Sequence, residues 1–191
     1  FIVIVLSIPL GIVLAFLMQI KFKPLNWLLT LYVWIMRGTP LLLQLIFVYY
    51  ALPSVGIVFD RLPAAILAFT LNYAAYFAEI YRSGIQAVPQ GQHEAAKILG
   101  YSKIQTFFKI VFPQMAKNIL PSVTNEVITL VKDTSLAFAI SYTEMFTLAK
   151  QVAAAQTTIM PLFIAGVFYY IFNFVVAFVM EKIEKRMNYY H

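Results

Sequence analysis

Cysteine is absent from this chain of 191 residues, and charged side chains are scarce. Without cysteine the chain has no disulfide framework, no thiolate metal site and no thiol redox chemistry. Charged residues make up 12% of the sequence, against about 25% in an average soluble domain. The two histidines, His93 and His191, stand in polar flanking segments and are typical of solvated surface residues. The sequence therefore predicts no metal site.

Residue patterns that carry catalysis are also missing. The sequence has no Walker-type glycine loop, no nucleophile paired with a base, and no carboxylates at metal-ligand spacing. We therefore expect no catalytic residue and no cofactor in this chain. Any energy-requiring work must draw its energy from another protein.

Apolar residues, by contrast, make up 62% of the chain. A membrane-spanning helix needs about 20 mostly apolar residues, and five stretches meet or approach this length, at about 1–20, 40–59, 62–81, 116–140 and 158–180. The predicted fold class is an all-α integral membrane protein with five transmembrane helices in a single domain over 1–191. Phe1 already lies inside an apolar run that is too long for a signal peptide, so we expect preceding residues to be missing.

The placement of basic residues predicts the orientation, because Lys and Arg concentrate in cytoplasmic segments. They gather within 21–37, within 82–117 and after 181, whereas the expected outer loops hold only Arg61 and Lys150. We therefore expect the chain to start outside, with the segment 86–114 and the C-terminus in the cytoplasm. The same rule accounts for the net charge of +6, which in a soluble protein would suggest nucleic acid.

Two connecting segments carry further signals. Residues 21–36 have the spacing of a short interfacial helix, and the following "RGTP", Arg37, Gly38, Thr39 and Pro40, predicts a helix break and restart. In this interpretation Gly38 ends one helix, Thr39 caps the next, and Pro40 is its first residue. We expect a hinge where the chain enters the bilayer, or equally a gate or partner contact. Residues 141–157 are expected to form an outer connection.

A polar stripe runs along the fourth expected span. Its members fall at i, i+3, i+4, i+7, i+10 and i+11, which places them on one helix face. They are Ser122, Asn125, Glu126, Thr129, Lys132 and Asp133. Asn72, Tyr76 and Glu79 share a face of the third span that is expected to point inward, and the same span carries Ala64, Ala68, Ala74, Ala75 and Ala78 for close helix packing. Ionisable groups at mid-membrane depth favour a transport pathway; the alternative is that Lys132 and Asp133 reach the outer interface and Glu126 is structural.

The segment 86–114 is a polar island that predicts two short helices. The first starts at Pro89 or Gln90 and stops at Gly100, and the second has a capping box formed by Ser102 and Gln105. In the first helix, Glu94 is expected near the positive N-terminus, and Ala95 and Ala96 leave a low surface for a partner. In the second, the apolar stripe Ile104, Phe107, Phe108 and Val111 is expected to pack on the membrane domain, and Pro113 to end the helix.

The island resembles the EAA signature of bacterial ABC importer permeases. The residues that carry the likeness are Glu94-Ala95-Ala96, Gly100, Ile110 and Phe112-Pro113, with Phe112 where the signature commonly has Leu. The stretches "RGTPLLLQ", "AEIYRSGIQAVPQGQ" and "NEVITLVKDTSLAFAIS" are similar to permeases of the polar amino-acid uptake group. The resemblance thus covers nearly the whole chain.

This resemblance implies the transmembrane half of a type I importer in the bacterial cytoplasmic membrane. Its implied partners are ATP-binding cassette subunits that hold ATP and Mg, a second permease (an identical copy or a homologue), and an extracytoplasmic amino-acid-binding protein. Glu94, Ala95, Ala96 and Gly100 would then be the ATPase-coupling residues. For the substrate, Glu126 would hold the ammonium group, with Asn125, Thr129 and Lys132 as polar contacts.

Two alternatives remain open from the sequence. A secondary amino-acid transporter or channel not coupled to ATP would also need the polar stripe, but the long inverted repeats typical of that class are not evident. A nucleic-acid binder is suggested by the helix–glycine–helix of the island. The apolar stripe of the island, confined between two spans, argues against it, so we expect no nucleic acid.

Overall fold

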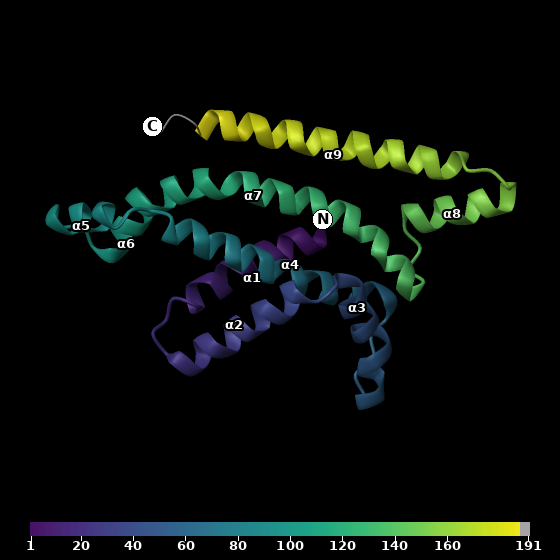
Figure 1. The fold of residues 1–191 in the computed structure, drawn as a ribbon, viewed down its shortest axis with the longest axis horizontal. Helices are drawn as coiled ribbons and strands as arrows, with labels where there is room; N and C mark the ends of the chain where they lie inside the picture. The colour runs from purple at the N-terminus through teal and green to yellow at the C-terminus, as the bar shows by residue number, and fades with distance from the viewer. Residues whose placement is uncertain (188–191) are drawn as a thin grey trace.

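The computed structural model describes residues 1–187, and in this range the chain is helical without strands. The elements in chain order are α1 Ile2–Leu17, α2 Lys23–Gly38, α3 Leu41–Ile46, the π-helical η1 Phe47–Ala51, the 3₁₀ turn η2 Leu52–Val55, α4 Arg61–Gln86, α5 Gln90–Ile98, α6 Lys103–Thr106, the π-helical η3 Phe107–Val111, α7 Phe112–Asp133, the 3₁₀ helix η4 Thr134–Ile140, α8 Met145–Gln156 and α9 Met160–Met187. Figure 1 places α5 and α6 at one end of the long axis and α8 at the other. The C-terminal end of α9 lies at the α5–α6 end. The predicted all-α fold is confirmed.

Each of the five expected spans coincides with a helix or a run of helices. By length and hydropathy alone, one helix within 1–187, Met160–Arg186, qualifies as a membrane span. The reason is physical: α1 has 16 residues, and α4 and α7 carry the polar side chains that the sequence predicts for the third and fourth spans. The exact membrane boundaries stay a prediction.

The small residues expected to allow close packing are buried in α4. Ala64, Ala68, Ala74, Ala75 and Ala78 are all buried. Gly11 of α1 sits directly on this surface, because a Cβ built there would lie 2.6 Å from Phe77 Cβ and 3.2 Å from the Ala74 carbonyl oxygen. Close backbone contact through small residues is a common way to join helices in lipid.

The segment expected as an interfacial helix and a straight second span has a different geometry. Helix α2 packs along α4, where the Tyr32 hydroxyl donates a hydrogen bond of 2.6 Å to the Leu71 carbonyl. The chain then turns by 107° between α2 and the run Leu41–Val55. The break lies beside Asn72, near the middle of α4 rather than at its end. The expected break at this motif is present, and its depth in the bilayer stays a prediction.

The break itself falls at Thr39 and not at Gly38. Gly38 is the last residue of α2, whereas Thr39 is extended, with φ −120° and ψ 147°, and Pro40 is the N-cap of α3. A residue that precedes proline is sterically disfavoured in the α region. Pro40 therefore displaces the break by one residue from the position predicted for it.

Pro113 does not end the second helix of the island. Helix α6 continues through η3 into α7, with Pro113 in the first turn of α7. The π-helical turn Phe107–Val111 ends two residues before Pro113, and the π-helical turn Phe47–Ala51 ends two residues before Pro53. A proline ring clashes with the carbonyl four residues earlier and lacks an N–H. A wider π turn at that place relieves both problems, so the helix carries on.

The expected outer connection 141–157 contains a helix that sequence patterns did not indicate. Helix α8 begins after Glu144, whose carboxylate accepts hydrogen bonds from the backbone N–H of Phe146 at 2.7 Å and Thr147 at 2.6 Å. Glu is an uncommon N-cap, and the segment is short and rich in Ala, Thr and Gln. Figure 1 shows α8 folded back beside the start of α9.

Candidate functional site

A polar cavity of about 540 Å³ lies between the break after α2, the middle of α4 and the second half of α7. Its lining residues are Arg37, Gly38, Thr39, Pro40, Leu41, Asn72, Tyr73, Tyr76, Asn125, Glu126, Thr129 and Asp133. The structure thus brings together the whole "RGTP" motif, two residues of the predicted face of the third span and four of the six stripe residues. These segments are distant in sequence, and the turn of 107° is what lets the motif reach the stripe.

The cavity holds one cation and two carboxylates. Arg37 lies over the ring of Tyr76, with its guanidinium carbon 5.3 Å from the ring centroid. The hydroxyl of Tyr73 donates a hydrogen bond of 2.7 Å to an oxygen of Asp133. Glu126 lines the same cavity. Opposite charges therefore face one space, as recognition of a zwitterion requires.

Three of the predicted pathway residues lie elsewhere. Ser122 is exposed and does not line the polar cavity. Lys132 lines a different cavity of about 400 Å³, between α7, α8 and α9. Glu79 accepts a hydrogen bond of 3.0 Å from Arg82 Nε and lies 4.0 Å from Arg37 Nη1. It thus links the C-terminal half of α4 to the motif from outside the cavity.

A partly buried amide network, centred on buried Asn72, holds the break in place. The Asn72 side chain donates hydrogen bonds to the Met36 carbonyl at 2.8 Å and to Gln44 Oε1 at 3.0 Å. Gln44 in turn donates to the Met36 carbonyl at 2.9 Å and to Thr39 Oγ1 at 2.7 Å. Gln44 and Tyr73 were not predicted as site residues. A glutamine inside the apolar run "LLLQLIF" was the available signal for the first.

The predicted architecture of the island is confirmed at its turns. Gly100 has φ +76°, in the left-handed region after α5. The Ser102 hydroxyl accepts a hydrogen bond of 3.3 Å from the Gln105 N–H, and the Gln105 side chain accepts one of 2.9 Å from the Ser102 N–H. These two bonds are the predicted capping box. The two helices are thus fixed relative to each other by a left-handed glycine and a cap.

Other details of the island differ from expectation. Glu94 is the fifth residue of α5 and lies outside its first turn, so the helix dipole stabilises it little. Ala95 is exposed, but Ala96 is fully buried. Ala96 therefore packs inside the island, whereas Ala95, Ile98 and Leu99 form its exposed surface.

The apolar stripe of the second helix is only partly packed. Val111 is buried and Phe107 half-buried, whereas Ile104 and Phe108 are 72% and 63% exposed. The π-helical turn at 107–111 changes the helical phase, because it adds a residue to the turn. A stripe drawn at a constant 3.6 residues per turn does not hold across this turn, and Ile104, which precedes the turn, is exposed as well.

The structure combines a bundle of long helices, a polar cavity at a broken helix and an exposed amphipathic island. These features are typical of a membrane transport component. The chain belongs to the family described as binding-protein-dependent transport system inner membrane component, whose model matches residues 7–189. It is therefore the membrane permease of an ABC importer rather than a transporter of another class.

Curated relatives of this chain are amino-acid transport permeases. An L-cystine permease of Bacillus subtilis is 37% identical over 97% of this chain and 82% of the relative. An arginine permease of the same organism is 38% identical over 96% and 85%. An octopine permease of Rhizobium radiobacter is 40% identical over 94% and 79%.

Solved structures agree with this family. The chain is similar to an amino acid ABC transporter crystallised with histidines, with a TM-score of 0.89 and 30% identity over 97% of this chain and 87% of the other. The inward-facing MetNI methionine transporter, with a TM-score of 0.78, 19% identity and coverage of 97% and 88%, has the same fold. The fold expected for a type I importer is thereby confirmed.

Proposed function

We propose that this permease moves polar amino acids inward across the bacterial cytoplasmic membrane, and that they pass through the polar cavity at the break after α2. The observation that carries the proposal is the set of opposite charges around one cavity, Arg37 on one side and Glu126 and Asp133 on the other. Relatives named for transport of cystine and arginine support the substrate class.

The chemistry of an amino acid fits these groups. Arg37 offers a planar guanidinium, which binds carboxylates through paired hydrogen bonds, and it would take the α-carboxylate. Glu126 would take the α-ammonium group. Asn125 and Thr129 add neutral donors and acceptors on the same face of α7. Lys132, expected at first as a polar contact, is replaced in this role by Arg37, because Lys132 lines the other cavity.

The energy would come through the island. We place Glu94, Ala95 and Gly100 at the surface that docks on a partner ATPase, with Ala96 supporting it from beneath. That ATPase would hold the ATP and Mg, and a second permease and an extracytoplasmic binding protein would complete the importer. The island and the C-terminal end of α9 lie at the same end of the molecule (Figure 1), which fits a cytoplasmic position for both.

The proposal is tested by uptake into proteoliposomes that contain the permease, its ATPase and its binding protein. A Glu126→Gln variant removes one negative charge and keeps the shape of the side chain. Because hydrogen bonds to charged groups contribute roughly 1.5–3 kcal/mol, we expect transport efficiency to fall about tenfold or more. Asp60→Asn, an exposed carboxylate outside the cavity, is the matched control.

Two results would overturn the proposal. Unchanged affinity and rate for every amino acid with Glu126→Gln would remove the cavity from the pathway. Equal uptake with and without ATP would contradict coupling to an ATPase. It would favour the alternative of a transporter or channel that is not coupled to ATP.

A further inference from the structure

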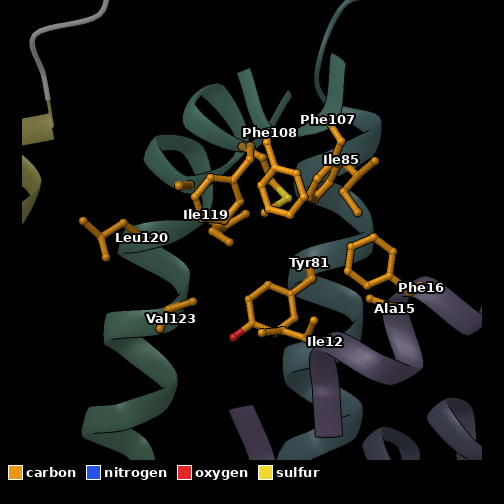
Figure 2. A pocket seen from close by; sticks show the side chains of 13 residues that line it. Ile12, Ala15, Phe16, Tyr81, Ile85, Phe107, Phe108, Ile119, Leu120 and Val123 are labelled. Carbon is orange, nitrogen blue, oxygen red and sulfur yellow. The ribbon is translucent and has the colours of Figure 1, made fainter. Parts of the chain in front are cut away.

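A second cavity, of about 460 Å³, lies at the C-terminal end of α4, away from the break beside Asn72, and is almost wholly apolar. Figure 2 shows its walls: Phe16 from α1, Tyr81 and Ile85 from α4, Phe108 from η3, and Ile119 from α7. The ring of Phe16 packs edge-on against Phe107, with 5.4 Å between centroids, and joins α1 to η3 at one side of the cavity. The volume is in the range of small-molecule sites, about 300–1,000 Å³.

The cavity is open rather than sealed. Phe108 and two other lining rings, Phe16 and Phe112, stay 45% or more exposed in the single chain. Such a surface does not hold water well, because its walls offer water almost no hydrogen-bond partners. Around a membrane helix the available apolar solvent is the acyl chain of a lipid.

Basic residues stand close in sequence to residues that line this cavity, and no acidic residue stands among them. Lys21 and Lys23 follow the end of α1, and Lys103 and Lys109 flank the ring pair of η3. The first acidic residue of the chain is Asp60, and none lies between Glu94 and Glu126. None of these four lysines makes an ion pair with a carboxylate of residues 1–187.

From these two observations we propose that the cavity binds an anionic phospholipid, with an acyl chain among the rings and the headgroup on the lysines. Lysines at a membrane surface attract anionic headgroups, each by a factor of about five. The apolar cavity supplies what a general surface attraction lacks, a fixed place for one chain. The lipid thus binds at a defined position between α1, α4 and η3.

The position of the lipid gives it a role in coupling. Phe107 and Phe108 belong to the π-helical turn that joins the island to α7. An acyl chain packed behind them fills the space into which this turn would otherwise bend. The bound lipid therefore stiffens the connection between the ATPase-docking surface and the polar cavity.

The test uses fluorescence quenching by lipids with brominated acyl chains, which quench only tryptophans that they touch. The two native tryptophans, Trp27 and Trp34, are replaced by Phe in the assembled transporter. One reporter, Phe107→Trp, then stands in the cavity wall, and a second, Phe174→Trp, stands on the exposed apolar surface of α9. Both are reconstituted in phosphatidylcholine vesicles with brominated phosphatidylglycerol or brominated phosphatidylcholine at matched fractions.

We expect brominated phosphatidylglycerol to quench the reporter at position 107 at least fivefold more effectively than brominated phosphatidylcholine, and the reporter at 174 to respond equally to both. The preference should fall in a Lys21→Gln, Lys23→Gln, Lys109→Gln variant, and not in Lys185→Gln, whose amine pairs with Glu181. Ala116→Phe, which adds a ring within the cavity wall, should remove quenching by both lipids at position 107.

Two outcomes overturn the proposal. Equal quenching by both lipids at position 107 would show ordinary lipid contact without headgroup recognition. No quenching at 107, together with normal quenching at 174, would show that another protein covers the cavity in the assembled transporter. Neither result depends on transport, so the lipid proposal and the proposed function can fail independently of each other.

Discussion

Tyr73 of α4 donates a hydrogen bond of 2.7 Å to Asp133 of α7 and ties the two helices together beside the polar cavity. The ring of Tyr73 is 2% exposed, so the hydroxyl has little freedom to turn elsewhere. One of the two cavity carboxylates is therefore held in place by the protein.

Removing this bond should loosen the contact between α4 and α7. We expect Tyr73→Phe to lower stability by roughly 1.5–3 kcal/mol, the contribution of a hydrogen bond to a charged group. Thermal unfolding in detergent, followed by circular dichroism, would measure it as a lower Tm. Tyr81→Phe is the control, because Tyr81 is also buried and stacks on Phe77. An equal drop in both variants would contradict a specific role for Asp133.

The amide network should determine how rigid the break is. Asn72→Leu keeps the volume of the side chain but removes its bonds to Met36 and Gln44. Because the chain has no cysteine, spin labels at Leu28→Cys and Val55→Cys would report only the angle between α2 and the following run. We expect Asn72→Leu to broaden the distribution of distances between the two labels, measured by pulsed electron paramagnetic resonance. The control Asn118→Leu, on the exposed side of α7, should leave the width of the distribution unchanged. An unchanged width in Asn72→Leu would show that the network does not determine the rigidity of the break.

Gly100 should be required for the shape of the island. Its φ of +76° is unfavourable for other residues, and Gly100→Ala should cost about 1–2 kcal/mol at that residue. We expect weaker binding of the partner ATPase, measured by co-purification and by the ratio of ATP hydrolysed to substrate moved. Gly91→Ala lies inside α5 with open space around it, and there alanine should be neutral or slightly stabilising. If both variants coupled normally, the turn would have no part in docking.

Gly11 should be required for the contact of α1 with α4. An added Cβ would lie 2.6 Å from Phe77 Cβ, so Gly11→Ala must push the helices apart. Overpacking of this kind costs about 1–3 kcal/mol, and we expect a lower Tm and a lower yield of folded protein. Gly166→Ala in α9 meets no atom within 4 Å and is the matched control. Equal stability of the two variants would argue against the close approach.

The sequence was sufficient for the parts of the fold that follow local rules. The small residues of α4 predicted its close packing, and the sequence Gly100, Ser102, Gln105 predicted the turn and the cap of the island. Each of these depends on a few neighbouring residues and a backbone conformation that they strongly prefer. The helical stripe on α7 was also predictable, and four of its six residues line the polar cavity.

What the sequence could not predict depends on contacts between distant segments or on non-standard helical turns. Tyr73 becomes a site residue only because α7 brings Asp133 to it from 60 residues away. Lys132 leaves the stripe because α8 and α9 form another cavity on that side of α7. Phe108 leaves its expected face because a π-helical turn shifts the phase. A prediction from periodicity assumes a regular helix that packs on its neighbours with one face. The π-helical turn breaks the first assumption at Phe108, and contacts with several helices break the second at Tyr73 and Lys132.

The helical turns before Pro113 have a mechanical consequence. From Lys103 to Ile140 the chain runs through α6, η3, α7 and η4 without an intervening loop. About 35 Å of helix separates Lys103 from Glu126 at roughly 1.5 Å per residue. A force applied to the island therefore acts on the far carboxylates through a lever arm. A tilt of the island would therefore also move the cavity end of α7, because no loop interrupts the helical run.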